Sequence, residues 1–298
     1  MALSPCNTET DARGRELTVH GTPFFPVACY HDDLAARDVP WHWHEELEAI
    51  LVTQGQAVVA AGGDKFTVPK GDGMVINTGV LHAVWQEGSE KCRLHSVVFH
   101  PRLVGGSLDS IYWRNYLQPV MTDEALKGMY LNRTALWQKE ALDAIEDAWQ
   151  ACAAEAPGFE FHVREKLSRL IFLLASHRPA IPRHPSEKSL RDGERIKIML
   201  QYIHQHYSQE LSTAHIARSA MISVSECLRC FHGTIGMTPI QYVKRFRIQT
   251  AADLLRNTSK KVVDIGAICG FQEMSYFAKT FRQLMGCTPT EYRRQAGL

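Results

Sequence analysis

Short apolar runs separated by glycine-containing turns extend from Leu47 to about Phe99. Runs of this kind, closed by regular turn signals, are typical of antiparallel strands in a barrel or sandwich. The runs lie at 50–52, 57–60, 65–68, 74–76 and 94–99, and the turns contain Gly55, Gly62, Gly63, Gly71 and Gly79. The pattern therefore predicts an antiparallel β-barrel or sandwich in the N-terminal part of the chain.

Two later segments carry apolar residues at helical spacing. The first stripe consists of Leu142, Ile145, Trp149 and Cys152, and the second consists of Val163, Leu167, Leu170, Ile171 and Leu174. Covering the barrel of its own chain is the more common fate of such a face. The pattern predicts two helices that flank the barrel.

From about residue 190 onward, one helical pattern occurs twice. Residues 236–242 align with 286–292 at an offset of 50, and Ile216-Ala217 aligns with Ile265-Gly266 at an offset of 49. Each copy indicates a short helix, a tight turn and a second helix. Two helices joined by such a turn, present twice, are typical of tandem helix-turn-helix DNA-binding domains.

Capping residues define the helices of the first copy. Ser212 and Ser223 are N-cap candidates for its two helices. Gly236 ends the second of these helices, and Thr238 followed by Pro239 starts a long helix that runs to about Arg256. In the second copy, Gly270 occupies the turn.

The net charge of the chain changes from negative to positive at a proline-rich segment. Residues up to Ser186 include 17 basic and 23 acidic side chains. The whole chain has 33 basic and 32 acidic side chains, so the remainder has 16 basic and 9 acidic ones. The first part is acidic and the second basic, as expected when one domain contacts phosphate. Three prolines between 179 and 185 favour an extended spacer. The predicted limits are 1–178 for the barrel domain, 179–189 for the linker and 190–298 for the helical domain.

Composition excludes several classes of protein. A chain of 298 residues has room for two domains, and 45% hydrophobic with 22% charged residues is ordinary for a globular protein. No uncharged apolar run reaches the 18 or so residues of a membrane span, and the N-terminus lacks a secretory signal, so we expect a cytoplasmic protein without a membrane partner. The C-x-x-C of Cys227 and Cys230 has no second pair, which favours packing over metal binding.

The most specific part of the repeat comprises 267–271 and 276–282, followed by Gly286, Thr288-Pro289 and 292–294. This segment resembles the AraC-type (AraC/XylS) family of bacterial transcription regulators, over roughly 196–294. The resemblance implies two recognition helices in successive major grooves of promoter DNA, activation through RNA polymerase and an effector-binding domain. It also implies an antiparallel helix pair between two subunits, and we predict a homodimer resting on the first stripe.

Family positions carried over one by one give the residues expected to contact DNA. They are Ser225, Glu226, Leu228 and Arg229 in the first recognition helix and Met274, Ser275 and Lys279 in the second. Arg229 is the strongest candidate for a base contact, because a guanidinium can bind guanine through two hydrogen bonds; a phosphate contact or a solvated charge is the alternative. Residues expected to neutralise phosphates are Lys244, Arg245, Arg247, Arg293 and Arg294.

The helical domain departs from the family pattern at three positions. Met221 replaces the glycine or asparagine common in the turn, where a left-handed backbone would be strained. Gly266 replaces an alanine inside a helix, at a cost of about 1 kcal/mol. Lys261 stands where a capping serine is frequent.

A histidine motif marks the barrel. On one strand, His42, His44 and Glu48 would share a face. With Gly55 and a distant His82, this spacing resembles the first and second motifs of the cupin barrel, from which Ala36, Asn77 and Gln86 depart. The candidate effector pocket is therefore His42, Trp43, His44, Glu48 and His82. The four ligand-type residues among them suit a divalent transition metal, or else they merely line the pocket.

The sequence thus predicts an α+β protein with an N-terminal cupin-like antiparallel β-barrel, flanking helices and an all-α DNA-binding domain. We expect a non-enzymatic, effector-responsive regulator of transcription that binds double-stranded promoter DNA. The alternative is a metal-dependent cupin enzyme, such as a dioxygenase or isomerase, in which the helical repeat is an interaction module.

Overall fold

The computed structural model describes residues 3–4, 8, 10–11, 14–88, 90–123, 126–178 and 187–295. The chain divides into two compact units, Met1–Gly193 and Glu194–Leu298. Most of the predicted linker, 179–186, lies outside the described residues. Residues 187–189 belong to helix α5 (Glu187–His206) instead of the linker, and the division between the units falls inside this helix.

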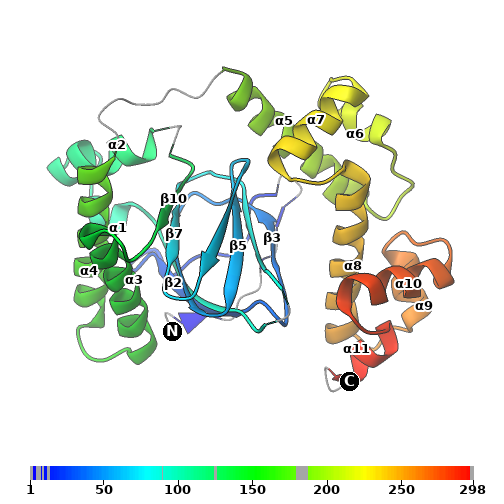
Figure 1. Cartoon of the computed structure of the whole chain (residues 1–298), viewed down its shortest axis with the longest axis horizontal. Helices are drawn as coiled ribbons and strands as arrows, with labels where there is room; N and C mark the ends of the chain where they lie inside the picture. The colour runs from blue at the N-terminus through cyan, green and yellow to red at the C-terminus, as the bar shows by residue number, and fades with distance from the viewer. Residues whose placement is uncertain are drawn as a thin grey trace. The chain divides into compact units, whose positions relative to one another are not determined.

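Two sheets build the N-terminal unit (Figure 1). The six-stranded sheet has the order β1-β2-β9-β4-β7-β10, and the four-stranded sheet has the order β3-β8-β5-β6. All pairings are antiparallel except that of β1 with β2. The strands are β1 Leu3–Ser4, β2 Val27–Asp33, β3 Val39–His42, β4 Leu47–Gln54, β5 Gln56–Ala61, β6 Asp64–Pro69, β7 Gly73–Ile76, β8 His82–Gln86, β9 Arg93–Phe99 and β10 Gly128–Leu131.

Successive side chains of β4 lie in the two different hydrophobic cores of this unit. Ile50 and Val52 pack between the sheets, whereas Ala49 and Leu51 pack on the opposite face, against the helices. Successive side chains of a strand point to opposite faces, so Glu48 shares the inward direction of Ile50. Both faces of β4 are buried, and its only buried ionisable group points between the sheets.

Helices cover the outer face of the six-stranded sheet. Two long ones, α3 (Leu136–Ala154) and α4 (Phe159–His177), lie side by side, as Figure 1 shows. Shorter elements complete this layer: α1 Arg102–Gly105, the π-helical turn η1 Trp113–Leu117 and α2 Gln118–Met121. Both apolar stripes are buried inside their own chain: the first packs against this sheet, and the second packs on α3 and the shorter helices. The prediction of a dimer interface on the first stripe is therefore wrong, because Leu142 and Ile145 have no exposed surface.

The second unit contains the repeated helical pattern. Its elements after α5 are α6 Thr213–Ser219, α7 Val224–Thr234, α8 Pro239–Asn257, α9 Val262–Ile268, α10 Met274–Met285 and α11 Pro289–Gln295. Ser212 and Ser223 cap α6 and α7 through their side chains, and Thr238 forms a capping box with Gln241. The predicted cap positions are confirmed, and Lys261 indeed provides no side-chain cap for α9.

The two turns of the repeat have the same backbone geometry. Met221 has φ of 54° and Gly270 has φ of 81°, so both occupy the left-handed region. The N–H of each donates to a carbonyl three residues earlier, and the next N–H donates to a carbonyl five residues earlier. Met221 thus carries the strain that the sequence predicted.

Candidate functional site

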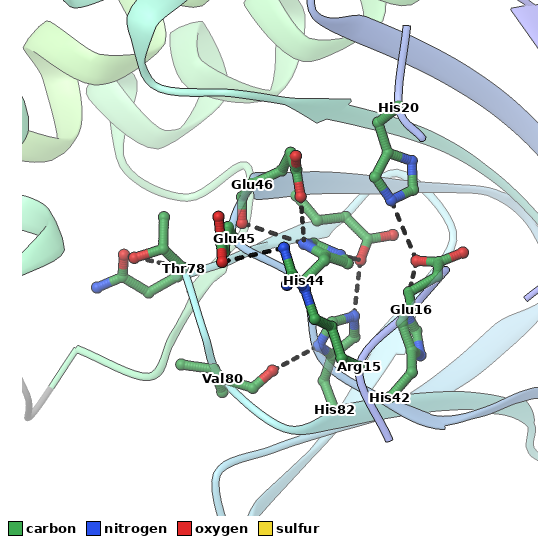
Figure 2. A network of polar contacts seen from close by, with 12 residues as sticks. Arg15, Glu16, His20, His42, His44, Glu45, Glu46, Thr78, Val80 and His82 are labelled. Carbon is green, nitrogen blue, oxygen red and sulfur yellow. Dashed lines mark hydrogen bonds and ion pairs between the residues drawn. The ribbon is translucent and has the colours of Figure 1, made fainter. Parts of the chain in front are cut away.

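The histidine motif spans two strands from different sheets. β3 ends at His42 and β4 begins at Leu47, so the prediction that 42, 44 and 48 share one strand is wrong. Residues 43–46 instead turn the chain from the four-stranded to the six-stranded sheet. His82, the first residue of β8, pairs directly with His42. His42, His44, Glu48 and His82 lie together inside the barrel. Figure 2 shows the three imidazoles.

Main-chain carbonyls orient all three imidazoles. The Nδ1 atoms of His42 and His82 lie 2.8 Å from the carbonyls of Pro40 and Val80, and Nδ1 of His44 lies 3.2 Å from that of Glu46. A carbonyl oxygen can only accept, so each Nδ1 donates its hydrogen. In the neutral imidazole, Nε2 then carries the lone pair. Hydrogen bonding at the remote ring nitrogen is what fixes metal-ligating histidines in proteins.

The ligand-type atoms lie close together and are shielded from solvent. Each of the four groups offers one atom, and these atoms all lie within 4.8 Å of one another. Glu48 Oε2 is 2.9 Å from His82 Nε2 and 3.5 Å from His44 Nε2. Both of these buried nitrogens lack a hydrogen bond of good geometry. Ligands about 2.1 Å from one metal ion are separated by roughly 3.4 Å in a tetrahedron, so the set fits such an ion.

Electrostatics of the cluster favour positive charge beside Glu48. Burial alone would raise the pKa of Glu48, but contacts with His44 and His82 hold it well below its usual value. Burial opposes protonation of His82, yet the Glu48 carboxylate raises the pKa of this imidazole. The pKa of His42 is lowered to about 3 by burial and by the neighbouring His82. Imidazole nitrogens together with one carboxylate are the donor chemistry of a site for a divalent transition metal.

Trp43 and two residues that the sequence did not single out lie around the cluster. Trp43 is half-buried, and its ring packs under the guanidinium of Arg15, 5.9 Å away. Glu16 and His20 come from the segment that precedes the barrel, and together with His44 they form a second group of ligand-type residues. Glu16 lies far from any motif residue in the sequence, so no spacing signal connects it with the cluster.

The first candidate DNA-binding helix, α7, buries Cys227, Cys230 and Phe231, as its amphipathic pattern requires. The opposite face is accessible and carries the four predicted residues: Ser225, Leu228 and Arg229 are exposed and Glu226 is half-exposed. Both cysteines of the C-x-x-C lie on the packed face of this helix.

An ion-pair network occupies part of the accessible face of α7. Glu226 Oε1 lies 2.9 Å from Arg229 and 2.9 Å from Arg195 on α5. The side chains are 38% exposed for Glu226 and 40% for Arg229. In the free protein, two of the predicted DNA contacts are thus paired with each other, and a base or phosphate must compete with Glu226 for Arg229.

In the second recognition helix, α10, the predicted residues differ in exposure. Ser275 and Lys279 are exposed. Met274 instead packs against the core of the second motif, where its Sδ lies 2.8 Å from the place that a Cβ on Gly266 would take. Met274 is half-buried, and its contact with DNA stays a prediction. The same packing explains Gly266, because any side chain there would collide with Met274 and Phe277.

Two arginines expected at phosphates form hydrogen bonds within the second unit. Arg247 donates hydrogen bonds to the carbonyls of Tyr207 (2.7 Å) and Gln209 (2.6 Å), and burial lowers its pKa. Arg293 lies 3.4 Å from the carbonyls of Leu255 and Thr258 at the end of α8. Both guanidiniums therefore connect α8 or α11 to neighbouring backbone carbonyls within the second unit.

Comparison with known proteins agrees with this two-part arrangement. Residues 24–171 match the model of the AraC-like ligand binding domain, and residues 216–295 match that of a helix-turn-helix domain. The uncharacterised HTH-type transcriptional regulator YdeC of Bacillus subtilis (strain 168) is 30% identical over 291 residues, which cover 97% of this chain and 98% of YdeC. The HTH-type transcriptional activator RhaR of Mannheimia succiniciproducens is 25% identical, over 85% and 87% of the two chains.

Among solved structures, an AraC-type transcriptional regulator from Chromobacterium violaceum is 31% identical over 34% of this chain and 91% of its own, with a TM-score of 0.33. The matched domains and the relatives define a DNA-binding transcription regulator with a ligand-binding domain. The chain belongs to the AraC/XylS family of transcriptional regulators. The alternative of a cupin enzyme finds no support. In the part of the chain that the structure describes, no helix has both the length and the apolar character to span a membrane.

Proposed function

We propose that this regulator senses an effector inside its barrel and binds promoter DNA with α7 and α10 in successive major grooves. The exposed side chains Ser225, Leu228, Arg229, Ser275 and Lys279, together with the half-exposed Glu226, are the proposed contacts. Tandem recognition helices predict protected half-sites about 10 base pairs apart. We propose that this regulator acts in the cytoplasm and that it binds DNA without catalysing a reaction.

We assign the effector site to His42, His44, Glu48 and His82. The observation that carries this assignment is the orientation of three buried imidazoles by main-chain carbonyls, which leaves three Nε2 atoms and one carboxylate directed at one place. A bound divalent transition metal supplies Lewis acidity there, which suits an anionic effector. We propose that residues 1–178 carry the sensing function and that the DNA-binding function belongs to the unit that begins within α5.

We also propose a homodimer, with an interface on the outward surface of α4 in place of the buried first stripe. Phe161 and Phe172 are 79% and 42% exposed on this surface. Exposed aromatic residues of this size are favoured in protein interfaces. Light scattering at micromolar concentration should give twice the mass of one chain, and Phe161→Glu with Phe172→Glu should reduce it to one. Contact with RNA polymerase is the family role that we extend to this dimer.

Footprinting and elemental analysis test the proposal. Tag-free protein purified without added metal should contain close to one equivalent of a transition metal, and His82→Ala should contain little. DNase footprinting on the upstream region of its own gene should show two protected half-sites on one face of the duplex. A footprint that shows no such spacing would contradict the arrangement of the recognition helices, and substoichiometric metal in the unaltered protein would contradict the metal assignment.

A further inference from the structure

The segment before the barrel places a second carboxylate beside the histidine cluster. Glu16 is only 7% exposed, and its Oε2 lies 3.6 Å from Nε2 of His42. With His20 and His44 it forms a group whose ligand-type atoms lie within 4.8 Å of one another. In Figure 2, Glu16 is directed toward the imidazoles. Glu16 is not part of the group formed by His42, His44, Glu48 and His82, so its carboxylate must move toward them to enter the same coordination sphere, in which neighbouring ligands lie roughly 3 Å apart.

A hydrogen-bonded chain behind Glu16 fixes its orientation. His20 Nε2 lies 3.1 Å from Glu16 Oε2, and His20 Nδ1 lies 2.7 Å from the hydroxyl of Tyr30 on β2. Because a carboxylate can only accept, Nε2 donates to Glu16, and in the neutral ring Nδ1 accepts the hydrogen of Tyr30. Partners of this kind behind a ligand orient it toward a metal.

Main-chain hydrogen bonds hold the same segment on the barrel. The N–H of Glu16 donates to the carbonyl of Trp43 (2.9 Å), and the N–H of Trp43 donates to the carbonyl of Gly14 (3.0 Å). Arg15 points the other way, where it pairs with Glu45 at 3.0 Å and covers the ring of Trp43. Glu16 therefore faces inward by its position in the segment.

Charge balance indicates what the two carboxylates share. Glu16 and Glu48 are buried on either side of imidazoles whose Nδ1 hydrogens are already donated to carbonyls. Two buried negative charges need compensation, and a dication between the imidazoles supplies it. We propose that Glu16 is a fifth ligand of a divalent transition metal at this site. Metal binding then fastens residues 14–20 to the barrel, an inference that rests on the proposed metal site.

Metal titration of the full chain tests this proposal. Zn²⁺ affinity is measured by competition with a chelating dye, and coordination by the visible absorption of bound Co²⁺, which is stronger for four ligands than for five. Glu16→Gln keeps the size of the side chain and removes its charge, so we expect one bound ion, an affinity about 10- to 100-fold lower and a more intense Co²⁺ spectrum. Glu45→Gln, a neighbouring carboxylate at the surface, is the matched control and should behave like the unaltered protein.

Hydrogen exchange separates a ligand from a merely structural residue. Zn²⁺ should slow amide exchange at residues 14–20 in the unaltered protein and have much less effect in Glu16→Gln. Should Glu16→Gln fail to fold, Glu16→Asp keeps the charge with a shorter reach and should lose part of the affinity. Equal affinity and equal Co²⁺ spectra for Glu16→Gln and the unaltered protein would overturn the role of Glu16 and leave the four-residue site in place. Absence of metal binding by the unaltered protein would overturn the site itself.

Discussion

Replacing Gly270 with alanine tests whether the turn of the second helix-turn-helix unit is held by its backbone geometry. A left-handed backbone costs an L-residue roughly 1 to 2 kcal/mol relative to glycine. An added Cβ would also lie 2.8 Å from the carbonyl oxygens of Tyr207 and Ser208, and relief of such an overlap costs about 1 to 3 kcal/mol. The smaller conformational freedom of unfolded alanine returns about 0.5 kcal/mol. The expected loss is therefore about 2 to 4 kcal/mol.

Thermal unfolding of the full chain can isolate this effect. All six tryptophans, at 41, 43, 85, 113, 137 and 149, lie in the first unit, so their fluorescence reports that unit alone. Circular dichroism at 222 nm also includes the helices of the second unit. At about 4 to 5 °C per kcal/mol, Gly270→Ala should lower the helical transition by about 10 to 20 °C and leave the tryptophan transition unchanged.

Met221→Gly is the matched opposite change, because Met221 has the same backbone geometry at the corresponding turn. Its side chain is 93% exposed, so its removal sacrifices almost no packing. Relief of strain minus the added freedom of unfolded glycine gives a gain of about 0.5 kcal/mol. If Gly270→Ala left the helical transition in place, or if Met221→Gly destabilised the domain as strongly, the backbone argument would be refuted.

Three further substitutions probe other parts of the molecule. Arg229→Ala should lose about 1 to 3 kcal/mol at one base position in binding assays with operator variants, whereas a uniform loss across sequences would indicate a phosphate contact. Leu142→Ala should destabilise the first unit by about 2 to 5 kcal/mol in tryptophan-detected unfolding, because the side chain is fully buried; a change below about 1 kcal/mol would contradict its place in the core. Arg247→Ala should destabilise the second unit by about 1 to 3 kcal/mol in circular dichroism, since it deprives the carbonyls of Tyr207 and Gln209 of a charged donor, and a selective loss of DNA affinity without destabilisation would favour the predicted phosphate role.

Local signals made the helical domain predictable. Ser212, Ser223 and Thr238 cap helices through hydrogen bonds to N–H groups three residues later, an interaction that short sequence distances encode. The strain at Met221 followed from the family resemblance, because glycine or asparagine is common at this position of the turn. The role of Met274 was not predictable in this way, since the space that it fills depends on Gly266 in another helix.

In the barrel, the strands with clear apolar runs were found, and β1, β2, β8 and β10 were missed. β2 (Val27–Asp33) ends in charged residues, while β8 (His82–Gln86) and β10 (Gly128–Leu131) are short. The bend between His42 and Glu48 lacks glycine and proline, so it resembled a continuous strand. Glu16 reaches the cluster through contacts between distant segments, which no periodicity records.

The imidazoles of the barrel are aimed by peptide oxygens at positions 40, 46 and 80. Every amino acid brings such an oxygen, so replacement of these three side chains would leave the aiming groups in place as long as the chain keeps its path. The orientation of the three rings therefore depends on the path of the backbone and not on the side chains at positions 40, 46 and 80. Substitution of one of the three histidines would remove its imidazole but keep the carbonyl that orients it. A single mutation back to histidine would then restore the ring in its original orientation.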